Sequence, residues 1–284
     1  MRYFQPATLD EALAIRRDHD VTVLAGATDV YPAHTGRRAW GDPIHRDVLD
    51  ISRVAALRGI ADGGDHVRIG ALATWTDLIR AGLPPLFDGM KRAAREVGGV
   101  QVQNRGTVVG NACTASPAGD GIPNLLALDA VFEVEGPSPR LVPAQDFFTG
   151  YRATACGPHD IVTAIRIPKR GGRGHFVKLG ARRYLVISIA MVAAAVETDA
   201  ADRITSARIA VGACSAAARR LPLLEAALPG MPLADAPGLV EPRHLAELAP
   251  IDDIRASAGY RMAAALALVG DALADLSRPA ARVA

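Results

Sequence analysis

The sequence predicts an α+β protein with more than one domain. At 284 residues the chain is long enough for two or three domains. Segments with helix-capping signals alternate with short apolar runs bounded by glycine and proline, which indicates mixed helix and sheet content. From His175 onward the apolar runs lengthen and are followed by helical patterns, which predicts a separate C-terminal domain.

The N-terminal part predicts a small α/β piece. Thr8 and Glu11 form a capping box at the start of a short amphipathic helix. A buried strand is predicted at Val21–Leu24, and the AGATD loop follows it. A polar connection from His34 to Asp47 then leads to a second strand at Val48–Ile51. Ligand sites of α/β units gather at the carboxyl ends of strands, where this loop lies.

The middle part predicts a hairpin, helices and one mixed sheet. The hairpin joins Leu57–Ile60 to Val67–Ile69, and Thr74 caps the helix that follows. Further elements are predicted in the order helix Leu86–Val97, a long glycine-rich loop, helix Pro117–Leu128, and strands Val131–Val134, Arg140–Val142 and Ile161–Ile167. The run from Pro168 to Gly174 marks the end of this domain.

The C-terminal part predicts three strands followed by helices. The strands are Phe176–Leu179, Ser188–Glu197 and Ile204–Ala213, of which the last two form a hairpin. The helices are predicted at 219–227, 241–249 and 255–276. The last helix carries apolar residues at helical spacing, which we interpret as core packing.

Composition excludes several classes of function. A net charge of +2 is too small to indicate nucleic acid or an anionic membrane surface as partner. The three cysteines are scattered at 113, 156 and 214, which argues against a disulfide framework, structural zinc or an iron–sulfur cluster in this chain. The N-terminus lacks a signal-peptide pattern, and the longest apolar run is shorter than the ~20 residues of a membrane span. These features predict a cytoplasmic protein.

The stretch from Arg95 to Asp120 is the centre of the sequence pattern. It combines five glycines with short hydroxyl and amide side chains, which bond to nearby backbone and fix the shape of loops. Such a segment suits a polar, phosphate-bearing ligand held on backbone N–H groups. Taken alone, the pattern is also typical of an ordinary surface loop.

Three motifs in order resemble the FAD-binding medium subunit of the molybdenum hydroxylases, which include enzymes of the xanthine dehydrogenase, carbon monoxide dehydrogenase and hydroxybenzoyl-CoA reductase types. They are AGATD at 25–29, IGALATWTDL at 69–78 and TVVGN…SPAGD at 107–120. The segment 241–261 is similar to the closing part of the same family. The resemblance implies a PCMH-type FAD-binding fold. In it, an N-terminal α/β subdomain (1–52) and a middle α+β subdomain (53–172) hold FAD, and a C-terminal α+β flavoprotein domain (173–284) follows.

The resemblance also implies a cofactor site, residue by residue. One loop follows the FAD diphosphate, a second faces the phosphates, Asp120 holds the adenosine part, and Val97 and Val162 pack near the flavin. Lys178 lies by the isoalloxazine ring as the catalytic residue, since a cation there stabilises an anionic reduced flavin. The full cofactor-binding set is Val23, Leu24, Ala25, Gly26, Ala27, Thr28, Asp29, Val30, Val97, Thr107, Val108, Val109, Gly110, Asn111, Thr114, Asp120, Val162 and Lys178.

Two residues depart from the family pattern. Ala27 and Val109 each stand where the family commonly has glycine. If the backbone at either position needs a positive φ, the side chain is strained, most of all the β-branched valine. FAD binding would then be weakened.

For function, the resemblance implies the FAD-binding electron-transfer subunit of a heterotrimeric molybdenum hydroxylase. A large molybdopterin-binding subunit would hydroxylate the substrate, and a small subunit with [2Fe-2S] clusters would carry electrons to FAD in this chain. The complex would be a dimer of heterotrimers, and an external acceptor would take the electrons. Two alternatives stay open: a stand-alone FAD oxidoreductase, and a flavin-free docking scaffold.

Overall fold

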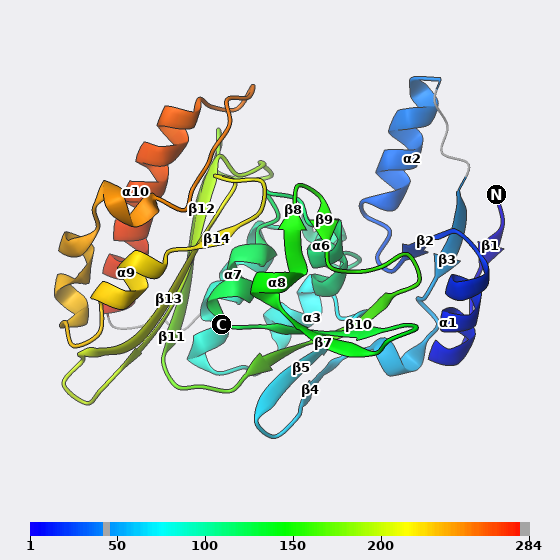
Figure 1. Cartoon of the computed structure of the whole chain (residues 1–284), viewed down its shortest axis with the longest axis horizontal. Helices are drawn as coiled ribbons and strands as arrows, with labels where there is room; N and C mark the ends of the chain where they lie inside the picture. The colour runs from blue at the N-terminus through cyan, green and yellow to red at the C-terminus, as the bar shows by residue number, and fades with distance from the viewer. Residues whose placement is uncertain (42–45, 279–284) are drawn as a thin grey trace.

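The computed structural model describes residues 1–41 and 46–278, and within them it has the mixed helix and sheet content that the sequence predicts. Three sheets of three to five strands follow one another along the described chain, with a two-stranded sheet and helices between and beside them (Figure 1). No helix in these described ranges is long and apolar enough to cross a membrane.

The N-terminal unit contains a three-stranded parallel sheet in the order β1–β3–β2. Its strands are β1 Tyr3–Phe4, β3 Asp47–Asp50 and β2 Val21–Leu24. Helix α1 (Leu9–Asp18) begins at the predicted capping box, in which Thr8 accepts from the Glu11 amide and the Glu11 carboxylate accepts from the Thr8 amide. Both predicted strands are confirmed, the second one residue earlier than expected.

Helix α2 (Val30–Ala39) corrects the sequence prediction, which treated His34–Asp47 as an irregular connection. This helix has no buried residue, and the Pro32 and Gly36 in its sequence favour a loop over a helix. Pro32 is tolerated because it lies in the first turn. Residues 42–45 of the predicted connection lie outside the described residues.

The middle unit contains a five-stranded sheet in the order β4–β5–β10–β6–β7. The strands are β4 Ile60–Asp62, β5 His66–Gly70, β10 Ile161–Pro168, β6 Val131–Glu135 and β7 Arg140–Pro143. All four ladders are antiparallel, so the prediction of a mixed sheet is wrong. Leu57 belongs to a 3₁₀ turn at Ala55–Leu57 rather than to the hairpin, because Val54 starts that turn before β4 begins.

The middle unit has the three helices predicted here, as α3, α4 and α7, and two further helices, α5 and α6, in the segment predicted as a long loop. They are α3 Trp75–Arg80, α4 Asp88–Glu96, α5 Val100–Gln103, α6 Val108–Thr114 and α7 Gly121–Ala127, with a short α8 at Ala144–Phe147. The glycine-rich segment is therefore partly helical. A small hairpin of β8 (Phe148–Gly150) and β9 (Ala153–Thr154) completes the unit.

The C-terminal unit contains a four-stranded antiparallel sheet in the order β11–β12–β13–β14. Its strands are β11 Arg173–Leu179, β12 Ala190–Thr198, β13 Ile204–Gly212 and β14 Arg219–Arg220. The helices after it are α9 Pro222–Ala227 and α10 Ala258–Ser277, joined through 3₁₀ turns at Leu233–Leu239 and Pro242–Leu245. The predicted helix at 241–249 is thus only a 3₁₀ turn, whereas the β12–β13 hairpin and the long last helix are confirmed.

The C-terminal sheet packs on both of its faces. Helix α10 covers one face, and α4 and α7 of the middle unit cover the other (Figure 1). Side chains of β12 alternate accordingly: Met191 and Ala193 belong to the core shared with the middle unit, and Val192 and Ala194 belong to the core under α10. This two-residue period also directs Lys178 of β11 toward the middle unit, two positions after buried Phe176.

An ion-pair network on the middle sheet gives a pH prediction. Glu133 on β6 accepts from Arg68 at 2.7 Å and also from Arg166. Burial raises the pKa of Glu133, but the hydrogen bonds from the two arginines outweigh it and hold that pKa below its ordinary value. The stabilisation is therefore present above the ordinary pKa of glutamate and is lost as the pH falls through the lowered pKa.

Accordingly, Glu133→Gln is expected to lower the free energy of unfolding by about 1 kcal/mol at pH 7. The difference from the parent protein should shrink as the pH falls below about 4. Urea unfolding at several pH values measures it. Glu135→Gln on the same strand is the control, since Glu135 has no ion pair in the described chain. A difference that does not change with pH would contradict the prediction.

Candidate functional site

The first loop of the candidate site follows the end of β2. The chain leaves the sheet after Leu24 and turns through Ala25–Asp29 into α2, whose first turn is joined by a hydrogen bond from the Tyr31 amide to the Ala27 carbonyl, 3.2 Å. Ala27 has φ +68°, in the left-handed region. Glycine is favoured there, and an alanine costs about 1 kcal/mol. The departure at Ala27 is thus a real strain in the loop.

The second loop runs from Asn104 into α6. Thr107 is the N-cap of α6, and its hydroxyl accepts from the Gly110 amide at 3.0 Å. Gly110 has no room for a side chain, because a Cβ there would lie 2.6 Å from the Thr107 hydroxyl oxygen. Val109 has ordinary helical conformation and is only 2% exposed. The strain anticipated at Val109 does not arise, because its backbone is helical and has no positive φ.

The two loops lie directly against each other. A Cβ on Gly26 would be 2.0 Å from the Arg105 carbonyl oxygen, so only glycine permits this approach. Across the same junction the Thr114 hydroxyl, which lies 3.0 Å from the Gly110 carbonyl oxygen, is also 3.3 Å from the Asp29 carboxylate. The two loops therefore form one surface, although Thr114 and Asp29 are 85 positions apart in the sequence.

The motif at 69–78 supports the second loop from behind. The Trp75 amide donates to the Gly106 carbonyl at 3.2 Å, and the Val108 amide donates to the Ala73 carbonyl at 3.0 Å. The Trp75 side chain is buried against Gly121, and Thr74 caps α3 as predicted. This motif therefore has a structural role, because its hydrogen bonds hold the second loop in place.

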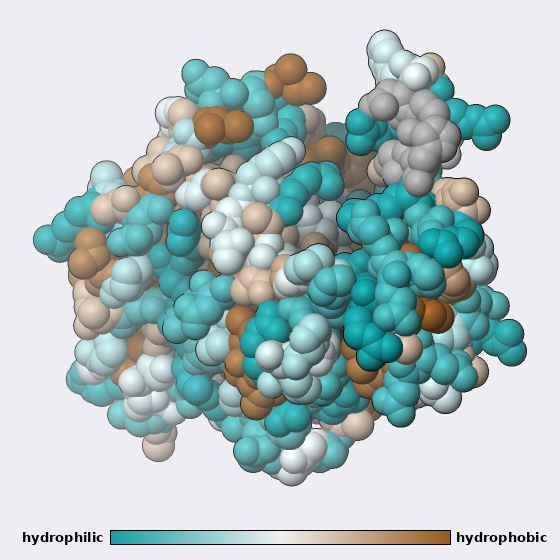
Figure 2. Space-filling view, turned by 45° about the vertical axis from the view of Figure 1, so that its right-hand side comes forward, coloured by the Kyte–Doolittle hydropathy of each residue, from teal (hydrophilic) through white to brown (hydrophobic). Residues whose placement is uncertain are grey.

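Several backbone N–H groups on the joined loops have no acceptor in the described part of the chain. They belong to Gly26, Ala27, Thr28 and Val109. By contrast, the Val108 and Gly110 amides are already bonded to protein oxygens. Unbonded amides on two adjoining turns form an anion-binding surface. Figure 2 shows that the molecular surface is hollowed near its upper edge, between the N-terminal unit on the right and the rest of the molecule.

A buried charged cluster connects the middle unit to the C-terminal sheet. Lys178 on β11 forms an ion pair with Asp120 at 2.7 Å, and each side chain is only 8% exposed. The Ser188 hydroxyl donates to the other Asp120 oxygen at 2.6 Å, and Lys178 also donates to the Val186 carbonyl at 3.2 Å. Burial raises the pKa of the Asp120 carboxyl, and Lys178 and Ser188 act in the opposite direction.

This cluster joins two of the predicted site residues. The resemblance assigned Asp120 to the adenosine part of FAD and Lys178 to the isoalloxazine ring, which are opposite ends of the cofactor. The two side chains are in direct contact in this structure, and the role of each toward FAD stays a prediction. Ser188 was not predicted at all, since a single serine in an apolar run gives no sequence signal of its partner.

The remaining predicted residues contribute in different ways. Leu24 and Val108 have core side chains, so any ligand contact from them is through the backbone. Val97 ends α4 and packs on the core, and Val162 is a buried residue at the start of β10. Val23, Ala25, Val30 and Asn111 are partly buried in or beside the two loops. A cofactor contact from any of them stays a prediction.

A capping prediction tests the second loop. Thr107→Ala removes the acceptor of the Gly110 amide and should lower the free energy of unfolding by about 1 kcal/mol. FAD retention should fall as well, because the unbonded Val109 amide lies in the first turn of the helix that Thr107 caps. Thr107→Ser keeps the acceptor and should behave as the parent. Equal FAD retention and equal urea midpoints in all three proteins would contradict the role of the cap.

Comparison with known proteins identifies the family. Residues 1–170 match the FAD binding domain in molybdopterin dehydrogenase, and residues 175–276 match the CO dehydrogenase flavoprotein C-terminal domain. The chain belongs to this flavoprotein family. This medium-subunit flavoprotein thus carries an FAD-binding domain followed by a C-terminal flavoprotein domain, as the motifs predicted.

Individual relatives and solved structures agree with the family match. The flavoprotein is 32% identical over 270 residues to the nicotine 6-hydroxylase medium subunit of Paenarthrobacter nicotinovorans, covering 92% of each chain. It is 34% identical over 174 residues to the carbon monoxide dehydrogenase medium chain of Hydrogenophaga pseudoflava, covering 58% of each. These relatives are oxidoreductase subunits. The structure superposes on the Hydrogenophaga pseudoflava carbon monoxide dehydrogenase with a TM-score of 0.84, at 29% identity and 96% coverage of both chains. For reconstituted CO dehydrogenase from Oligotropha carboxidovorans the TM-score is 0.87, at 26% identity and 98% and 97% coverage.

The residues of the site fit FAD. The two joined loops present small side chains and unbonded amides, as a diphosphate needs. Lys178 of β11, Asp120 before α7 and Ser188 before β12 provide a cation, a carboxylate and a hydroxyl where β11 faces the middle unit. A ligand with a charged diphosphate and a polar ring can therefore bind the joined loops with the first and the charged cluster with the second.

Proposed function

We propose that this chain is the electron-transfer subunit of a heterotrimeric molybdenum hydroxylase. A large molybdopterin-binding subunit and a small subunit with [2Fe-2S] clusters are its partners, in a dimer of heterotrimers. FAD bound here accepts electrons from the clusters and releases them to an external acceptor. The names of the relatives support this proposal, because nicotine 6-hydroxylase and carbon monoxide dehydrogenase each have a medium subunit similar to this chain.

The contact between the two loops carries the proposal. Gly26 against Arg105, with the unbonded amides of Ala27 and Val109 beside it, gives a surface for the FAD diphosphate. This chain's part is to bind the cofactor and orient it. The three cysteines of this sequence, scattered at 113, 156 and 214, are too few for an iron–sulfur cluster, so in this proposal the clusters lie on the partner subunit.

The pair of Lys178 and Asp120 has the electrostatic role in this proposal. A lysine beside the flavin stabilises negative charge on the reduced ring. Because Asp120 balances that charge when the flavin is oxidised, the pair can respond to reduction without leaving an unpaired buried cation. Ser188 keeps the carboxylate in place.

Two measurements test the proposal. The purified chain should be yellow and hold about one FAD per polypeptide, or regain it after incubation with FAD. Expressed together with a molybdopterin-type chain and an iron–sulfur chain, it should co-purify with both, and its flavin should be reduced when substrate is oxidised by the large subunit. Protein that stays colourless after FAD is added would favour a docking scaffold instead. Full activity without partner chains would favour a stand-alone oxidoreductase.

A further inference from the structure

Arg261 is a buried arginine in the first turn of α10 that bonds to two strands of the C-terminal sheet at once. Its side chain is only 1% exposed. The Nη1 atom donates to the Ile189 carbonyl at 2.5 Å and to the Ala213 carbonyl at 3.0 Å. Ile189 comes directly before β12, and Ala213 comes directly after β13. One guanidinium therefore joins the start of β12 to the end of β13.

Both of these backbone positions adjoin Asp120. Ser188, the residue before Ile189, donates its hydroxyl to the Asp120 carboxylate at 2.6 Å. On the other strand, the Ala213 amide donates to the carbonyl of Pro117 at 2.8 Å, three residues before Asp120. The carboxylate of Asp120 is thus approached from two sides by segments that Arg261 holds.

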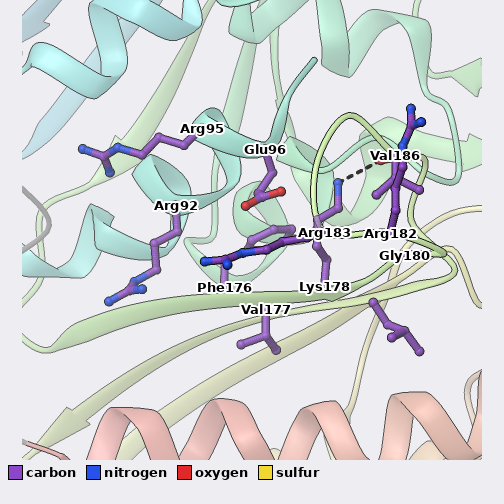
Figure 3. Close-up of a pocket in the computed structure, with 11 residues that line it drawn as sticks. Arg92, Arg95, Glu96, Phe176, Val177, Lys178, Gly180, Arg182, Arg183 and Val186 are labelled. Carbon is purple, nitrogen blue, oxygen red and sulfur yellow. Dashed lines mark hydrogen bonds between the residues drawn. The ribbon is translucent and has the colours of Figure 1, made fainter. Parts of the chain in front are cut away.

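The segment that carries Lys178 is tied to the same arginine. The Ile189 amide donates to the carbonyl of Leu179, the residue after Lys178, at 2.7 Å. Lys178 itself extends toward the loop at Val186 and donates to its carbonyl at 3.2 Å (Figure 3). The residue that accepts from Arg261 is therefore hydrogen-bonded to the strand of the lysine.

Arg261 is held in a fixed orientation by Asp253. The Arg261 Nη2 atom donates to one oxygen of Asp253 at 2.7 Å, and Arg255 pairs with the other oxygen at 2.6 Å. Arg255 also donates to the Ser188 carbonyl at 3.4 Å. Hydrogen bonds from Arg255, and then from Arg261, hold the pKa of Asp253 below its ordinary value, so this carboxylate stays charged.

Net stability alone does not account for this arginine. Removing a guanidinium from water is costly, and apolar side chains of similar volume often give equal or greater stability at a buried ion pair. The Arg261 Nε atom has no acceptor in the part of the chain that the structure describes, which adds to the cost. Ala213 has φ +61°, a strained conformation that persists only where its surroundings fix it. What Arg261 supplies is therefore the geometry of the backbone around it.

We propose that Arg261 is a positioning residue for the pair of Lys178 and Asp120. It fixes Ser188 and the turn at Pro117 against the carboxylate, and thereby sets where the lysine ammonium lies. The inference rests on the proposed function, in which that ammonium stabilises the reduced flavin. Arg261 acts through these residues rather than on the cofactor itself.

Urea unfolding of flavin-free, full-length protein tests the positioning directly. Asp120→Ala, Lys178→Met and the double variant give the coupling between the two side chains as a double-mutant cycle. When the same cycle is made in protein that carries Arg261→Met, this coupling should fall by about half or more, because Asp120 is no longer held at the lysine.

Arg208→Met is the matched control. Arg208 is also buried, donates to the Ala127 carbonyl at 3.0 Å and pairs with Glu197 at 2.9 Å. In the described chain none of its hydrogen bonds reaches Ser188, Ile189 or the carboxylate of Asp120. This variant should lose stability as Arg261→Met does, yet leave the coupling between the two side chains unchanged.

The midpoint potential of bound FAD gives a second readout. Lys178→Met should make the potential more negative, because the cation beside the reduced ring is lost. Arg261→Met should shift it in the same direction. The double variant Arg261→Met/Lys178→Met should have the potential of Lys178→Met alone, because the arginine acts only through the lysine. Arg208→Met should leave the potential at the parent value.

Three outcomes would overturn the role of Arg261: an unchanged coupling, additive shifts of potential in the double variant, or equal effects of Arg208→Met. If Arg261→Met does not fold, Asp253→Ala takes its place, because it removes the carboxylate that orients the guanidinium. It should give smaller changes in the same directions. A parent chain that binds no FAD would overturn the electron-transfer function together with the flavin role of the pair, whereas an unchanged coupling overturns the role of Arg261 alone.

Discussion

Gly26→Ala is expected to remove most of the FAD and to lower the free energy of unfolding by about 1–3 kcal/mol. The added Cβ would lie 2.0 Å from the Arg105 carbonyl oxygen and 2.9 Å from the Gly106 Cα. Backbone atoms cannot rotate away as a flexible side chain can, so the two loops must separate. The ratio of flavin to protein absorbance after gel filtration measures the loss of FAD, and urea unfolding measures the loss of stability.

Gly36→Ala is the control for this experiment. Gly36 lies in α2, and a Cβ added there meets no atom within 4 Å. Alanine in the middle of a helix is favoured over glycine by up to about 1 kcal/mol, so this variant should be equal to the parent or slightly more stable. If Gly26→Ala keeps as much FAD as Gly36→Ala, the contact between the loops is not what forms the cofactor site.

Asp120→Ala is expected to destabilise the protein by about 3–5 kcal/mol and to reduce FAD retention. The substitution leaves the Lys178 ammonium buried, with the Val186 carbonyl as its remaining protein acceptor in the described chain. A buried charge without its counterion costs more than the ion pair gains. Urea unfolding of the protein with and without FAD separates the effect on folding from the effect on cofactor binding.

The double variant Asp120→Ala/Lys178→Met distinguishes an ion pair from two independent residues. Removing both charges should cost less than removing Asp120 alone, because no buried charge is left unpaired. Additive losses in the two single variants would show that the side chains act separately. An Asp120→Ala protein with unchanged stability and full FAD content would contradict both the pairing and the proposed cofactor contact.

Sequence reasoning succeeded where a local signal was strong. The capping residues Thr8 and Thr74 predicted helix starts, and the long apolar runs predicted the β12–β13 hairpin. The three glycine-containing motifs predicted two loops of one site, and the structure brings those loops together. In each case neighbouring residues along the chain determine the structure, so the pattern is readable without knowledge of the fold.

Sequence reasoning failed where distant residues decide. Helix α2 buries no residue, and its Pro32 and Gly36 favour a loop. Val109 seemed unsuitable for a glycine position, yet α6 places its side chain in the core. The contacts among Asp120, Lys178 and Ser188 join segments up to 68 residues apart, and no spacing rule predicts them. The partly helical nature of the glycine-rich segment depends on the same tertiary packing.

The side chains of β12 alternate between two cores, and this affects where the chain can be truncated. Met191 and Ala193 complete the core of the middle unit, although the second family match, which contains them, begins only at residue 175. A fragment cut after the first match would leave α4 and α7 with an uncovered apolar face, and it would self-associate rather than fold as a free-standing module. The chain should therefore not be truncated between the two family matches. The FAD-binding part needs β12 of the C-terminal part to cover its core.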